Sequence, residues 1–114
     1  MAWMLEDFVN QDEGSRKFAA EYAGEAYVAA HSFKPKSLVN PHVLTNSDLM
    51  SFNTPALFLV GENEKIYSAQ QAVERLNTVA PKIETAIIPD AGHDLTMAQA
   101  DLVNNLILEF LQKP

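Results

Sequence analysis

Residues 54–64 read TPALFLVGENE, an apolar run that ends at a glycine and continues into two glutamates. A run without alternation between apolar and polar residues is typical of a strand that is buried on both faces, as strands of parallel sheets are. We therefore predict a strand over residues 56–60. Glu62 and Glu64 then lie in the loop that leaves the carboxyl end of this strand.

A second strand-and-turn unit follows later in the chain. Residues 85–88 read TAII and are predicted to form a short strand, and residues 89–93 read PDAGH, a tight turn that ends at His93. Between the two strands, the periodic apolar residues of 69–80 predict a helix. A strand, helix, strand order implies a right-handed crossover and a parallel pair of strands.

Two helix starts carry the residues of a capping box, in which a hydroxyl and a glutamine three positions later satisfy each other's backbone N–H groups. Ser68 and Gln71 fit this pattern before the helix between the strands. Thr96 and Gln99 fit it again before a C-terminal helix that continues through Phe110. The downstream part of the chain is therefore predicted to have the order strand, helix, strand, helix.

The upstream part of the chain has a helical pattern instead. Apolar residues recur at spacings of three and four over residues 15–32, which predicts a helix, and a shorter helix is expected around residues 3–9. Residues 34–46 contain two prolines and no clear period, so they are predicted to form a loop. One helical turn is expected after it, with Asn46 or Ser47 as its N-cap.

Composition suits a globular protein and disfavours several classes of function. Hydrophobic residues make up 47% of the 114, but no run reaches the roughly 18 to 20 apolar residues that a membrane span needs. A net charge of −7 without a basic cluster disfavours nucleic acid. The chain has no cysteine, and its start lacks the features of a signal peptide. We expect a cytoplasmic protein that binds neither nucleic acid nor membranes.

The two predicted loops place carboxylates and an imidazole at one edge of the sheet, where functional groups gather in parallel α/β folds. A carboxylate that accepts the Nδ1 proton of a histidine fixes the tautomer and leaves Nε2 able to take a proton from a serine. Glu64 is the candidate for this role beside His93, and Glu62 is near enough to compete. Asp90 and Asp94 flank His93, and they could orient it or form a metal site with it. The other two histidines show no ligand spacing, so we predict no metal ion and no cofactor.

These two motifs resemble the end of the α/β-hydrolase fold. TPALFLVGENE is similar to the family's penultimate core strand, in which the acid lies three residues after the glycine. IPDAGH, residues 88–93, is similar to the turn after the last strand, and the chain order of acid and histidine also fits. The resemblance implies that Glu64 is the acid and His93 the base of a catalytic triad.

The resemblance also implies a domain organisation. Residues 1–52 would form a helical cap segment, and residues 53–114 the C-terminal βαβα portion of the core. The expected architecture is a partial α/β-hydrolase fold, with two parallel strands and flanking helices preceded by the cap. Trp3, Phe18 and Tyr22 would then form either an acyl-binding wall or ordinary packing.

The sequence departs from the family in several respects. Glu64 stands where the family more often has aspartate, and the G-x-S-x-G nucleophile motif, the oxyanion-hole loop and the earlier strands of the sheet are missing. We therefore expect the C-terminal portion of a serine-type, esterase-like hydrolase that is inactive alone and meets a small-molecule substrate only in a complete enzyme. One alternative is a separate chain that supplies the serine. Another is a non-catalytic interaction module on a hydrolase-like scaffold. We expect a homodimer in which the Ala56–Val60 strands pair antiparallel, because an apolar edge strand invites pairing with a second chain.

Overall fold

The computed structural model describes residues 13–34 and 41–113. At its centre, strands β1 (Ala56–Gly61) and β2 (Ile83–Ile88) pair in parallel, with Ala56 opposite Ile83 and Gly61 opposite Ile88. The helices are α2 (Glu13–Ser32), α3 (Asn46–Met50), α4 (Ala69–Val79), α5 (Leu95–Ala98) and α6 (Ala100–Leu111). This order confirms the predicted α/β class with two parallel strands and flanking helices.

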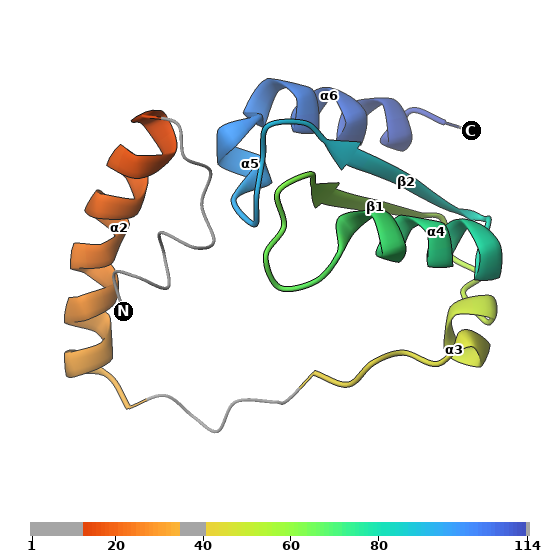
Figure 1. Cartoon of the computed structure of the whole chain (residues 1–114), viewed down its shortest axis with the longest axis horizontal. Coiled ribbons are helices and arrows are strands. Elements are labelled where there is room, and N and C mark those ends of the chain that lie inside the picture. Colours follow the sequence, from red (N-terminus) through yellow and green to blue (C-terminus); the bar gives the residue numbers. More distant parts are fainter. Residues whose placement is uncertain (1–12, 35–40, 114) are drawn as a thin grey trace.

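The two faces of the small sheet pack against different helices (Figure 1). On one face, Phe58 and Ile83 pack with Leu49 of α3 and with residues of α4. On the other face, the fully buried Ile88 packs against Val103 of α6. Because successive residues of a strand point to opposite faces, a strand covered on both sides needs apolar residues at consecutive positions. The unbroken apolar run of β1 follows from this arrangement.

Helix α3 begins one residue earlier than the sequence analysis proposed. Its N-cap is Thr45 rather than Asn46 or Ser47. The Thr45 hydroxyl accepts from the N–H of Asp48 at 3.2 Å, and the Asp48 carboxylate accepts from the N–H of Thr45 at 2.8 Å. This reciprocal pair requires an acid three residues after the N-cap. Thr45 has Asp48 at that position, whereas neither Asn46 nor Ser47 has an acid there.

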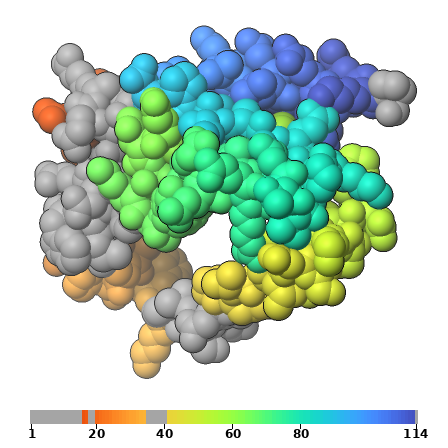
Figure 2. All heavy atoms as spheres, turned by 45° about the vertical axis from the view of Figure 1, so that its right-hand side comes forward, coloured from red at the N-terminus to blue at the C-terminus, as the bar shows by residue number. Residues whose placement is uncertain are grey.

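The segment before α3 is attached to α4 by Arg75. The guanidinium Nη2 donates to the carbonyl oxygen of Leu44 at 2.6 Å and to Oδ1 of Asn46 at 3.0 Å. Figure 2 shows residues 41–50, in yellow, beside the green to turquoise α4. Charge-assisted hydrogen bonds of this kind give a segment without regular structure a defined position against a helix.

The capping box proposed at Thr96 is wrong. Thr96 lies inside α5, which begins at Leu95, and Gln99 separates α5 from α6. Neither Asp94 before α5 nor Gln99 before α6 caps its helix with a side-chain hydrogen bond. Leu95 packs against the buried cluster around Ile88, so the helix starts where this packing is made and not where the capping residues stand.

Helix α2 confirms the helix predicted over residues 15–32 and stands apart from the sheet, with contacts to α5 (Figure 1). Tyr22 is about half exposed on it. The helix expected around residues 3–9 lies outside the described residues, as does the side chain of Phe18. Among the helices that the structure describes, none combines the length and the apolar character needed to span a bilayer.

Candidate active site

Both predicted loops leave the sheet at the same edge, because β1 and β2 are parallel (Figure 1). Backbone hydrogen bonds continue past the ends of the strands and join the loops. The N–H of Glu62 donates to the carbonyl oxygen of Ile88 at 2.8 Å, and the N–H of Asn63 donates to that of Ala91 at 2.8 Å. These backbone hydrogen bonds hold the two loops beside each other at this edge of the sheet.

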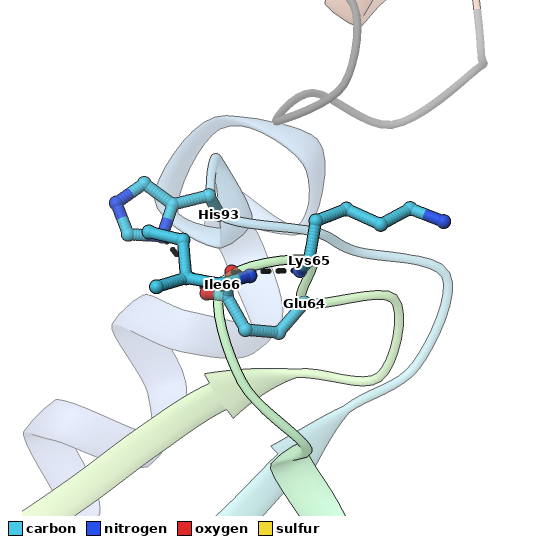
Figure 3. Close-up of polar contacts among 4 residues, drawn as sticks. All are labelled: Glu64, Lys65, Ile66 and His93. Carbon is cyan, nitrogen blue, oxygen red and sulfur yellow. Dashed lines mark hydrogen bonds and ion pairs between the residues drawn. The ribbon is translucent and has the colours of Figure 1, made fainter. Parts of the chain in front are cut away.

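The Glu64 carboxylate meets the His93 imidazole between these loops. Oε2 of Glu64 lies 2.8 Å from Nδ1 of His93 (Figure 3). The Glu64 side chain is only 2% exposed, whereas the His93 side chain is 53% exposed. The carboxylate is thus covered, while the ring lies at the surface with Nε2 directed away from Glu64.

The second carboxylate oxygen of Glu64 is held by the backbone of its own loop. Oε1 accepts from the N–H of Lys65 at 2.8 Å and from the N–H of Ile66 at 3.0 Å (Figure 3). The side chain therefore folds back over the two residues that follow it. Both oxygens have defined partners, so Oε2 is presented to His93 in one orientation.

The environment of Glu64 keeps its carboxylate ionised. Burial raises the pKa of Glu64, but hydrogen bonds from the Ile66 N–H, from His93 and from the Lys65 N–H together lower it below its ordinary value of 4.5. An ionised carboxylate only accepts hydrogen bonds, so Nδ1 of His93 must be the donor. The imidazole that results has its proton on Nδ1 and a basic Nε2.

Glu62, the competing acid, has a different partner. Its Oε2 accepts from the backbone N–H of Asp90 at 3.3 Å, and Asp90 adopts the left-handed φ of 51°. The structure therefore brings Glu64, not Glu62, to His93. Sequence reasoning missed the Glu62 contact, because a backbone partner 28 residues away leaves no motif to recognise.

The alternative metal site receives no support. Among residues 13–34 and 41–113, no group of three or more histidine, aspartate or glutamate side chains is arranged to hold a metal ion. Asp94, one of the proposed ligands, occupies the position before the first turn of α5. The described residues therefore give this edge of the sheet the chemistry of a carboxylate and an imidazole.

The acid that follows one parallel strand and the histidine that follows the next are joined through Nδ1, an arrangement in which a carboxylate orients an imidazole. The chain is a member of the α/β-hydrolase superfamily, and it matches one segment of its relatives. No protein-family model matches the sequence.

Carboxylesterase YbfK of Bacillus subtilis (strain 168) is 39% identical over 80 residues, which are 70% of this chain and 27% of the relative. The uncharacterized carboxylesterase nap of the same strain is 40% identical over 70 residues, or 61% of this chain and 23% of the relative. The chain thus spans about a quarter of the length of the curated relatives that it matches.

Solved structures agree with these sequence matches. The crystal structure of Bacillus subtilis YbfK superposes with a TM-score of 0.62 and 38% identity, over 71% of this chain and 28% of that one. A Bacillus subtilis protein assigned as a hydrolase superposes with a TM-score of 0.70 and 31% identity. That match covers 96% of this chain and 38% of the other, so it extends over most of the upstream helical part as well.

Proposed function

We propose that this chain is the acid–histidine portion of a serine-type carboxylesterase, in which Glu64 orients His93. The observation that carries the proposal is the 2.8 Å contact between Nδ1 of His93 and the buried carboxylate of Glu64. Carboxylesterases among the relatives support esters as the substrate class. Without a nucleophile, the chain alone is proposed to be inactive.

His93 acts first as a base and then as an acid in this proposal. Nε2 accepts the proton of a serine hydroxyl while the serine oxygen attacks the ester carbonyl carbon, and it then gives that proton to the departing alcohol. Water repeats the cycle to release the carboxylic acid and regenerate the serine. Glu64 stays ionised throughout and stabilises the imidazolium through Nδ1.

The serine and the oxyanion-hole donors are proposed to come from polypeptide that corresponds to the remaining length of the relatives. The sequence has no G-x-S-x-G motif of its own. Exposed apolar side chains support a covering polypeptide, since Leu108 and Leu111 on α6 are 54% and 69% exposed. Apolar surface of this kind is normally covered in a complete protein.

A chimera tests the proposed function. In it, the whole chain replaces the segment of Carboxylesterase YbfK that its 80 matching residues align with, together with flanking residues of that relative. The chimera is expected to hydrolyse p-nitrophenyl acetate, and the 114-residue chain alone is expected to leave the rate at the buffer background. The control is the relative with the same segment deleted.

Two results would count against the proposal. A chimera that unfolds cooperatively on heating but releases no nitrophenol would show that Glu64 and His93 do not serve the relative's chemistry. Turnover by the isolated chain, lost in His93→Ala, would refute its proposed inactivity.

The open edge of β1 favours a second candidate, a non-catalytic homodimer. In the part of the chain that the structure describes, β1 pairs with β2 alone. Pairing of two Ala56–Val60 segments across a two-fold axis would satisfy the backbone groups of that edge. Sedimentation equilibrium at micromolar concentration is expected to give twice the 12.6 kDa chain mass in this case. A single species at the monomer mass would exclude this candidate.

A further inference from the structure

The loops that carry Glu64 and His93 touch each other through their backbones. The hydrogen bond from Asn63 to the carbonyl oxygen of Ala91 lies one residue before Glu64 and two residues before His93. Ala91 is fully buried. The residues that hold the two loops together at this hydrogen bond therefore also set the distance between the Glu64 carboxylate and the His93 imidazole.

Gly61, the last residue of β1, lies close against the backbone of the loop that follows β2. A Cβ atom at this position would stand 2.8 Å from the carbonyl carbon of Ala91, and closer still to the carbonyl oxygens of Ala91 and Gly92. These are backbone atoms, which cannot rotate out of the way as the end of a side chain can. The φ angle of Gly61 is not positive, so glycine is needed here for space rather than for a special conformation.

The Glu62 side chain contacts the turn that follows β2. Its Oε2 accepts from the N–H of Asp90 at 3.3 Å, and Asp90 has a φ of 51°. Residues other than glycine adopt this left-handed region uncommonly, and aspartate is among those that tolerate it best. The Glu62 contact favours the conformation that turns the chain from β2 towards His93.

We propose that Gly61 and Glu62 are positioning residues for the Glu64–His93 pair. Gly61 sets how closely the two loops approach, and Glu62 sets the direction of the turn at Asp90. The catalytic meaning of this assignment rests on the proposed function, whereas the geometry belongs to this chain alone. Displacements of about 1 Å in such supporting residues are enough to cost a hundredfold in rate.

The first test replaces Gly61 with alanine in the 114-residue chain and examines His93 by NMR at pH 8. Imidazole ¹⁵N shifts report the tautomer, and a downfield proton signal reports the Nδ1–H hydrogen bond to Glu64. The parent is expected to show the Nδ1–H tautomer and this proton. In Gly61→Ala the proton signal is expected to be lost and both tautomers to be present.

Gly24→Ala is the matched control, because a Cβ atom at Gly24 has nothing within 4 Å. It lies inside α2 and is expected to leave the His93 signals unchanged. Backbone amide shifts of β1 and β2 verify that each variant keeps the fold. A folded Gly61→Ala chain with the parent tautomer and proton signal would overturn the role of Gly61.

The second test uses Glu62, which is exposed and can be replaced without disturbing the buried clusters. Glu62→Gln keeps an acceptor oxygen for the N–H of Asp90, whereas Glu62→Ala removes it. The proton signal of His93 is therefore expected to persist in Glu62→Gln and to be lost in Glu62→Ala. A parent-like spectrum in Glu62→Ala would overturn the role of Glu62, and loss of the proton signal in both variants would overturn its action through the acceptor oxygen. This test stands whether or not Gly61→Ala folds.

These readouts separate the positioning role from the proposed function. They depend on the geometry of one chain and need no nucleophile or substrate. An inactive YbfK chimera with the parent His93 spectrum would reject the esterase proposal and leave the positioning role intact. The reverse result, an active chimera whose Gly61→Ala and Glu62→Ala forms keep the parent spectrum, would reject the positioning role alone.

Discussion

Replacing His93 with alanine is expected to abolish ester hydrolysis by the chimera of this chain with Carboxylesterase YbfK. Alanine cannot accept the serine proton, so the serine attacks as a weak, neutral hydroxyl and the leaving alcohol receives no proton. Loss of the histidine from such a triad costs about a millionfold in kcat. The KM for p-nitrophenyl acetate is expected to change little, because the imidazole contributes to the transition state rather than to ground-state binding.

Steady-state release of nitrophenol measures the effect, with burst kinetics at high enzyme concentration to detect residual acylation. His31→Ala is the matched control. His31 is an exposed histidine of α2 whose Nδ1 lies 2.8 Å from the carbonyl oxygen of Tyr27. Its replacement is expected to leave kcat within a few-fold of the parent chimera. A His93→Ala chimera that retains a tenth of the parent rate would show that another group supplies the base.

The approach of an acid to His93 could be predicted from the strand order alone, whereas the choice of Glu64 over Glu62 comes only from the resemblance to the family motif. An unbroken apolar run and a crossover of the right length place two loops at one edge by general rules of parallel sheets. The choice between Glu62 and Glu64 depends on local hydrogen bonds. The N–H groups of Lys65 and Ile66 turn the Glu64 carboxylate back over its own loop.

The first residues of the helices could also be predicted only in part from the sequence. The predicted N-caps of α3 are Asn46 and Ser47, but it is Thr45 that has an acid three residues later, Asp48, and that caps the helix. That signal is present in the sequence. At Thr96 the pattern is equally good, yet packing of Leu95 against the cluster around Ile88 begins the helix earlier. A capping motif contributes about 1 kcal/mol and full burial of a leucine about 1.5 to 3 kcal/mol, so the partial burial of Leu95 is of a size that can compete with the cap.

Replacing Glu64 with glutamine is expected to lower kcat of the chimera by about ten-thousandfold, because it reverses the tautomer of His93. The carboxylate has two acceptor oxygens, one for the N–H groups of Lys65 and Ile66 and one for Nδ1 of His93. Glutamine has a single oxygen, which the two backbone donors retain. Its NH₂ group then faces Nδ1, which must accept, and the ring proton moves to Nε2.

An imidazole with its proton on Nε2 cannot take the proton of a serine at that nitrogen. Glu64→Gln is therefore expected to keep the shape of the site and to lose its activity. The ¹⁵N shifts of His93 in Glu64→Gln are therefore expected to report the Nε2–H tautomer, together with the loss of nitrophenol release. Glu109→Gln makes the same charge change on the exposed side of α6 and is expected to alter neither readout. If Glu64→Gln kept the Nδ1–H tautomer and a rate within tenfold of the parent, Glu64 would not be the residue that orients His93.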